Sequence, residues 1–142
     1  MSTFADTSAL VKLYVDEEGH ETLGRLRDLV ISQLARVEVV GALWRAYRRG
    51  GLSASGAATL VADFEADYSQ DPPRFAVVAP NPALLDDAAR LTGVHGLRGY
   101  DAVQLASARA AAAVDDRVRT FAAYDRALRD AAAREGFVLI PS

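Results

Sequence analysis

The feature that most constrains this chain is a regular alternation between short, continuously apolar stretches and longer segments with helical periodicity. The candidate strands cover residues 3–6, 30–31, 74–79, 118–123 and 137–140. Their apolar positions are successive, which is typical of strands that are covered on both faces. Such strands, separated by helices, predict a parallel sheet between two layers of helices. We expect one α/β domain over residues 1–142, because no linker, repeat or low-complexity tract divides the chain.

The segments between the strands carry signals of helices with defined ends. Helical spacing of apolar residues predicts helices over residues 8–15, 21–29, 33–49, 55–68, 82–92, 101–114 and 126–134. Ser32 is expected to cap the third of these, and Ser53 or Ser55 the fourth. Asn81 followed by Pro82 predicts a capped helix start with proline in the first position. Residues 93–99, punctuated by glycine, are expected to form a loop.

Composition excludes several classes of protein. Hydrophobic residues make up 51% of the chain and charged residues 25%, with a formal net charge of −3, so a globular domain is expected rather than a disordered chain. The absence of cysteine excludes disulfides, thiol catalysis and thiolate zinc sites. No apolar run approaches the roughly 20 residues that span a bilayer, and the N-terminal residues lack the pattern of a signal peptide. A cytoplasmic protein that does not contact membranes is therefore expected.

Four acidic residues stand where a parallel sheet would gather them. Asp6 ends the first strand, and Asp125 follows the fourth. Glu38 and Asp101 lie in the first turns of two helices. Ligands of open α/β folds bind outside the carboxyl ends of the strands. Carboxylates that meet there raise one another's pKa unless a cation balances their charge, and an all-oxygen site suits Mg²⁺ or Mn²⁺ rather than zinc.

Each of these acids also has a structural explanation. Asp101, with Gln104 three residues later, resembles a capping box. Glu38 in a first helical turn favours the helix dipole without any function, and Asp125 before a helix is a candidate cap. Asp6 is harder to explain in this way, because it ends a strand that should be buried. Taken together, the four positions favour a shared site.

Four ordered segments surround these acids: residues 4–14 (FADTSALVKLY), 32–38 (SQLARVE), 97–106 (LRGYDAVQLA) and 121–128 (FAAYDRAL). They resemble the motifs of PIN-domain proteins, in the branch of VapC-type toxin ribonucleases, and the similarity extends over essentially the whole chain. The resemblance implies a PIN-like three-layer α/β/α sandwich with a five-stranded parallel sheet. It also implies a Mg²⁺- or Mn²⁺-dependent endoribonuclease, the toxin of a type II toxin–antitoxin pair.

The resemblance assigns roles to the acids and their neighbours. Asp6, Glu38 and Asp101 are expected to bind the metal ion, with Glu38 direct or bridged by water. Thr7 or Ser8 would help through a hydroxyl or backbone contact. Asp125 completes the catalytic set as its weakest member. This chain has Ala123 where the family often has Thr, Ser or Asn, so Asp125 is expected to act through water or on a second ion.

The expected partners are RNA, a second copy of the chain and an antitoxin. The resemblance implies a homodimer and a cognate VapB-like antitoxin whose C-terminal segment lies in a groove and blocks the acidic pocket. RNA would be held by basic side chains, and its affinity would then decrease with rising salt concentration. The candidates for this contact are Arg36, Arg45, Arg48, Arg49 and Arg98. The alternative for Arg45, Arg48 and Arg49, late on the long helix, is a solvated end whose cations favour the helix dipole.

Two other functions fit parts of the pattern. A receiver-type phosphotransfer protein also gathers aspartates at a parallel sheet, but it requires an aspartate after the third strand and a lysine after the fifth. Here the third strand ends at Ala79-Pro80 and the only lysine is Lys12. The second alternative is a non-catalytic RNA-binding or scaffold domain with a degenerate pocket, and the presence of all four acids argues against it.

Overall fold

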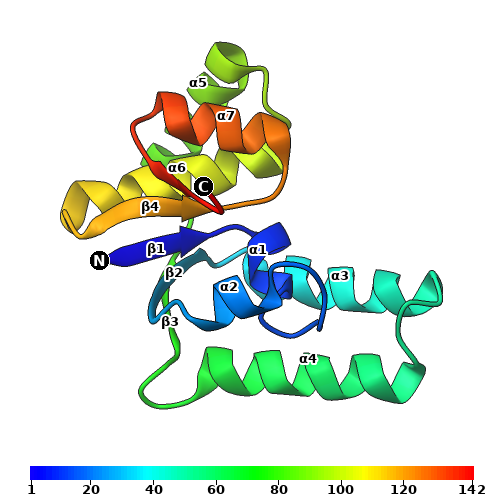
Figure 1. The fold of residues 1–142 in the computed structure, drawn as a ribbon. Coiled ribbons are helices and arrows are strands. Elements are labelled where there is room, and N and C mark those ends of the chain that lie inside the picture. Colours follow the sequence, from blue (N-terminus) through cyan, green and yellow to red (C-terminus); the bar gives the residue numbers. More distant parts are fainter.

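The computed structural model describes residues 1–142 and has one five-stranded sheet at its centre (Figure 1). All strand pairs are parallel, and the order across the sheet is β3-β2-β1-β4-β5. The strands are β1 (Ser2–Ala5), β2 (Asp28–Ser32), β3 (Phe75–Val78), β4 (Val118–Ala122) and β5 (Val138–Ile140). The expected α/β class with a five-stranded parallel sheet is therefore confirmed.

Seven helices connect and cover the strands. They are α1 (Thr7–Val11), α2 (His20–Gly24), α3 (Ala35–Arg48), α4 (Ala54–Ser69), α5 (Pro82–His95), α6 (Gly99–Val114) and α7 (Arg126–Arg134). The Ser53 side chain caps α4, and Asn81 caps α5 with Pro82 at its start, as the sequence predicts. None of the helices combines the length and the apolar character that a bilayer crossing requires.

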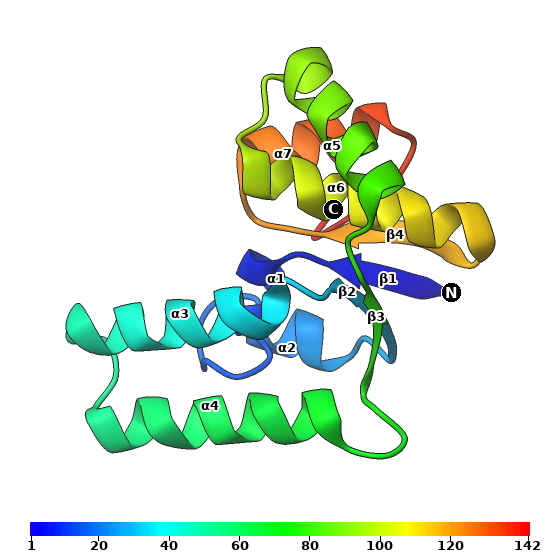
Figure 2. The ribbon, with the colours of Figure 1, turned by 180° about the vertical axis from the view of Figure 1, so that it is seen from behind.

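The helices form two layers, one on each face of the sheet. Figures 1 and 2 show α5, α6 and α7 on one face and α1 to α4 on the other. Neighbouring positions of a strand point to opposite faces, so Phe4 packs with α5, α6 and α7 whereas Ala5 packs with α1, α3 and α4. Phe4 stacks on Phe121 of the adjacent strand at 5.3 Å between ring centroids. Two separate cores thus hold the central strands β1 and β4 in place.

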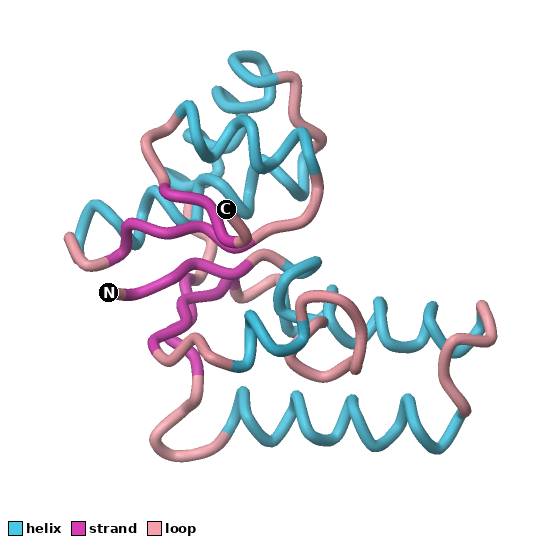
Figure 3. The backbone as a smooth tube through the Cα atoms, viewed as in Figure 1, coloured by secondary structure: helices cyan, strands magenta, loops and turns pink.

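The order in which the parallel strands are added reverses at the centre of the sheet. From β1 the chain adds β2 and then β3 on one side, and it then crosses to place β4 and β5 on the other side. The tube in Figure 3 shows β1 and β4 side by side, although nearly the whole chain separates them. A reversal of this kind opens a crevice at the carboxyl ends of the two central strands.

Several local predictions were wrong. The helix expected over 8–15 ends at Val11, and α5 continues to His95, into the loop expected over 93–99. The helix expected over 21–29 is only the short α2, because β2 begins earlier, at Asp28. Ser32 does not cap α3: its hydroxyl accepts from the backbone N–H of Leu34, which is itself the N-cap residue and has no side-chain bond. The strand expected to be buried over 74–79 lies at an edge, and Val77 is exposed.

Candidate active site

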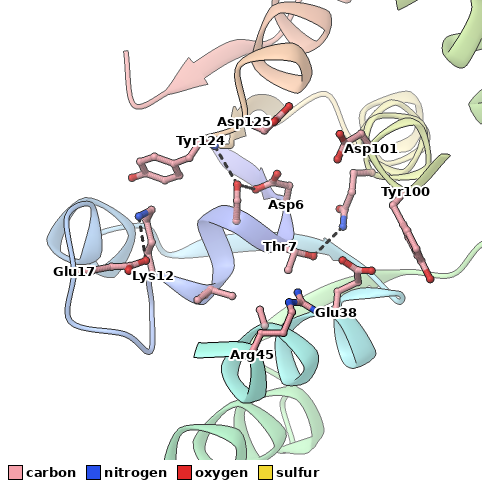
Figure 4. Close-up of a pocket in the computed structure, with 14 residues that line it drawn as sticks. Asp6, Thr7, Lys12, Glu17, Glu38, Arg45, Tyr100, Asp101, Tyr124 and Asp125 are labelled. Carbon is pink, nitrogen blue, oxygen red and sulfur yellow. Dashed lines mark hydrogen bonds and ion pairs between the residues drawn. The ribbon is translucent and has the colours of Figure 1, made fainter. Parts of the chain in front are cut away.

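A pocket of about 440 Å³ opens at the carboxyl ends of the central strands (Figure 4). All four predicted acids line it, although they come from four different parts of the chain. The lining residues are Asp6, Thr7, Ser8, Val11, Lys12, Glu17, Glu38, Ala42, Arg45, Tyr100, Asp101, Gln104, Tyr124 and Asp125. The pocket therefore brings together the four acids on which the sequence prediction depends.

Asp6 is the most buried acid of the pocket. It follows β1 directly and is the N-cap of α1, with only 4% of its surface exposed. Its Oδ1 accepts from the Ala9 backbone N–H at 2.9 Å and from the Ser8 hydroxyl at 2.7 Å. Burial raises the pKa of Asp6 from 3.8 to about 6 despite these hydrogen bonds, and the charges of Asp101 and Asp125 add to the rise. The ionised form of Asp6 is therefore unfavourable in the folded protein, and a neighbouring positive charge would stabilise it.

The first turn of α1 connects the elements that carry the acids. Ser8 Oγ donates to Asp6 and accepts from the Tyr124 backbone N–H at 3.1 Å, so it joins the end of β1 to the loop after β4. Thr7 Oγ1 accepts from Gln104 Nε2 at 3.2 Å, which joins α1 to α6. Thr7 and Ser8 therefore hold the surrounding backbone, in addition to lining the pocket.

Asp101 and Glu38 face the pocket from first helical turns. Asp101 lies in the first turn of α6 and is half-buried. Burial raises its pKa, with the charge of Asp125 and, more weakly, that of Glu38 acting in the same direction, while Arg98 lowers it. The capping-box interpretation of Asp101 was wrong, because the N-cap of α6 is Arg98 and Gln104 bonds to Thr7 instead. Figure 4 shows both carboxylates pointing toward the pocket.

Asp125 has a structural role at the same edge. It is the N-cap of α7, and its side chain accepts from the Leu128 backbone N–H at 3.0 Å. It is exposed at the pocket rim. In Asp125, as in Asp6, one carboxylate oxygen serves a helix cap and the other has no protein partner.

The donor set suits a hard divalent cation that keeps part of its water shell. The pocket offers carboxylate and hydroxyl oxygens and no histidine or cysteine. No three His, Asp or Glu side chains lie close enough together to hold one ion among them. Mg²⁺ typically binds through one or two carboxylates and retains several waters. Burial and, more weakly, neighbouring carboxylates raise the pKa values of Asp6 and Asp101, and a bound cation would offset that repulsion.

The five candidate arginines occupy different places. Arg45 lines the acidic pocket. Arg98 lines a smaller adjoining pocket of about 270 Å³ that shares Asp101 and Asp125 with it. Arg36 pairs with Glu65 of α4 at 2.8 Å, so a neighbouring helix already occupies this guanidinium. Arg48 and Arg49 are exposed at the end of α3 and line neither pocket.

Sequence reasoning missed several pocket residues. Lys12 Nζ bonds to Glu17 Oε1 at 3.1 Å and lies 4.4 Å from the centroid of the Tyr124 ring. This cluster closes one side of the pocket, and its only sequence signal is that Lys12 is the single lysine of the chain. Gln104 also lines the pocket and is nearly fully buried.

The fold and the acidic pocket together define a PIN domain. The family model described as "PIN domain" matches residues 3–138 of this chain. The chain is also 34% identical to Ribonuclease VapC45 and to Ribonuclease VapC49, from two strains of Mycobacterium tuberculosis. Each match covers 98% of this chain and 94% of the relative. The chain therefore belongs to the PIN-domain family, in its VapC branch.

Solved structures show the same fold. PAE2754 from Pyrobaculum aerophilum superimposes with a TM-score of 0.66 at 23% identity, covering 99% of this chain and 84% of that one. Mycobacterium tuberculosis VapC20, described as a sarcin-ricin loop cleaving toxin, gives a TM-score of 0.63 at 19% identity, with 96% of both chains covered. At these identities the likeness concerns the fold alone.

Proposed function

We propose that this chain is a divalent-cation-dependent endoribonuclease and the toxin of a VapBC-type toxin–antitoxin pair. One observation carries the proposal: four separate elements deliver Asp6, Glu38, Asp101 and Asp125 to one pocket at the strand edge. Relatives of nearly the same length that are named ribonucleases support the choice of RNA as substrate.

The four acids would bind Mg²⁺ or Mn²⁺ in different ways, some directly and some through water. Asp6 and Asp101 would bind the ion directly, since burial already makes their negative charge unfavourable. Glu38 would bind through water, since no three acidic side chains lie close enough to hold one ion, and Asp125 through water or on a second ion. A bound divalent ion would polarise the phosphodiester, lower the pKa of an attacking water and stabilise the leaving oxygen. Breaking the bond between phosphorus and the 3′ oxygen then leaves a 5′-phosphate and a 3′-hydroxyl.

The chain's remaining groups hold the site and the RNA. Ser8 and Thr7 fix the backbone around Asp6 through their bonds to Tyr124 and Gln104. Arg45 at the pocket wall is the best placed of the arginines to contact a phosphate near the acids. The reaction would take place in the cytoplasm, where the RNA substrate is found.

The decisive experiment is cleavage of RNA by the purified protein with and without divalent cations. Cleavage with Mg²⁺ or Mn²⁺ is expected, with loss of activity in EDTA and in Asp101→Asn. Asp116→Asn serves as the matched control, because this exposed acid lies outside the pocket. RNA binding without cleavage by the wild-type protein would instead support the scaffold alternative.

The proposed partners need separate tests. Co-expression with the adjacent gene product, followed by affinity capture, tests for an antitoxin, which is expected to abolish cleavage. A groove of about 450 Å³ between the end of α1 and the start of α4, lined in part by Tyr14 and Leu60, is one apolar surface available to it. Light scattering of the purified chain tests the homodimer, and a monomeric mass would contradict it.

A further inference from the structure

Gln104 is the one pocket residue with a buried polar atom that has no partner. It lies on α6, three residues after Asp101, and only 5% of it is exposed. Its Nε2 donates to Thr7 Oγ1 at 3.2 Å, whereas its Oε1 is buried without a hydrogen bond. Residues three apart lie on one face of a helix, so Gln104 and Asp101 both face the pocket.

A buried amide oxygen without a donor is energetically unfavourable. Leaving such an acceptor unsatisfied costs about 1–3 kcal/mol, and an amide oxygen can only accept. Because Nε2 is engaged by Thr7, Oε1 is the amide atom left without a partner. The group that completes the site must therefore bring a proton donor.

The charges around Gln104 identify that donor. The charged side chains of the pocket are five carboxylates and the two cations Lys12 and Arg45, so the lining has a net negative charge that attracts a cation. A hydrated divalent cation satisfies both demands at once, since it balances the carboxylates and its retained waters donate hydrogen bonds. An anionic group from RNA would bring acceptors toward an acceptor, which is unfavourable.

We propose that Gln104 Oε1 accepts a hydrogen bond from a water molecule carried by the divalent cation. Gln104 is then a positioning residue of the cation site rather than a direct ligand. This inference rests on the proposed function, because it requires that the acids hold a cation. Residues of this kind typically contribute about 10- to 100-fold to metal affinity.

The test is a titration of the full chain with Mn²⁺ in the absence of RNA, in which electron paramagnetic resonance measures the free ion. Gln104→Leu keeps the approximate volume and removes both polar groups, so its Kd is expected to rise about 10- to 100-fold. Gln104→Glu keeps an acceptor oxygen, and the Thr7 hydroxyl can donate to it, so wild-type or tighter binding is expected. Ser107→Ala is the matched control, because Ser107 is buried on the same helix but bonds only to the Val103 carbonyl.

Thermal unfolding without metal separates this role from simple packing. Gln104→Leu removes an unsatisfied buried acceptor but also the hydrogen bond to Thr7, so its metal-free Tm is expected to stay close to that of the wild type. Its stabilisation by Mn²⁺ is expected to be smaller. Wild-type Mn²⁺ affinity in Gln104→Leu, or equally weak binding in Gln104→Leu and Gln104→Glu, overturns the inference. If Gln104→Leu does not fold, weaker binding by Gln104→Glu alone overturns it, and wild-type or tighter binding supports it.

The outcome for the wild type separates this inference from the proposed function. If the wild-type chain binds no Mn²⁺, both the role of Gln104 and the proposed function lose their basis. Wild-type binding that Gln104→Leu leaves unchanged removes only the role of Gln104, and the acids stand as the cation site.

Discussion

Replacing Asp6 by Asn is expected to stabilise the metal-free protein while removing its activity. Asn keeps an oxygen that can accept from the Ala9 backbone N–H, and it is as good an N-cap residue as Asp. What it removes is a charge that is 4% exposed and lies near the charges of Asp101 and Asp125. The substitution therefore isolates the electrostatic cost of the site.

The size of the effect follows from the pKa of Asp6. A carboxyl that titrates at 3.8 in the unfolded chain and at about 6 in the folded protein lowers stability by about 3 kcal/mol at pH 7. The sign follows from proton binding: between these two pKa values the folded protein holds a proton that the unfolded chain has lost. Wild-type stability relative to Asp6→Asn is thus expected to fall as pH rises through this window. Below pH 4 the two proteins should converge.

Urea unfolding in EDTA at several pH values measures this difference. Asp6→Asn is expected to be more stable by about 3 kcal/mol at pH 7 and by less than about 1 kcal/mol at pH 4. Adding Mn²⁺ should stabilise the wild type by mass action and the variant much less. A difference independent of pH, or an Asp6→Asn protein that is less stable at pH 7, would refute the reasoning.

Three further predictions concern the Asp101 carboxyl, the contacts of Glu135 and the binding of RNA. Arg98→Ala removes a positive charge that lowers the pKa of Asp101, so the carboxyl shift of Asp101, followed by NMR without metal, should titrate at higher pH than in the wild type. Glu135→Ala should lower the free energy of unfolding by about 2 kcal/mol, because His95 Nε2 bonds to Glu135 at 2.7 Å and Arg109 also donates to it; urea melts that match the wild type would contradict this. RNA affinity, measured by fluorescence anisotropy in EDTA, should fall steeply with rising salt, and a flat dependence would exclude phosphate contacts.

The placement of the acids could be predicted because it depends on topology more than on detail. Once the strands are parallel, residues that directly follow them meet at one edge, which fixes Asp6 and Asp125. The positions of Glu38 and Asp101 follow from the same reasoning, since both residues lie in the first turns of helices that start at that edge. The apolar strand pattern carries this information, and the structure has the predicted sheet.

The contacts among side chains could not be predicted, because they depend on where helices begin and how they pack. Gln104 was interpreted as the partner of a capping box, but α6 begins at Gly99, which turns it toward Thr7. Arg36 has the charge needed for RNA, yet α4 packs beside α3 and supplies Glu65 as its partner. An apolar run also cannot distinguish an edge strand from a central one, which is why the exposure of Val77 was missed.

The pairing of β1 with β4 has a consequence for how this protein is made. Asp6 and Ser8 are synthesised long before Tyr124, whose backbone N–H bonds to Ser8, because 116 residues separate Ser8 from Tyr124. Translation adds about 5–20 residues each second, so a growing chain spends several seconds with half of its pocket missing. The acidic pocket cannot form until the segment around Tyr124 and Asp125 has been made. The proposed antitoxin would have that interval in which to accumulate.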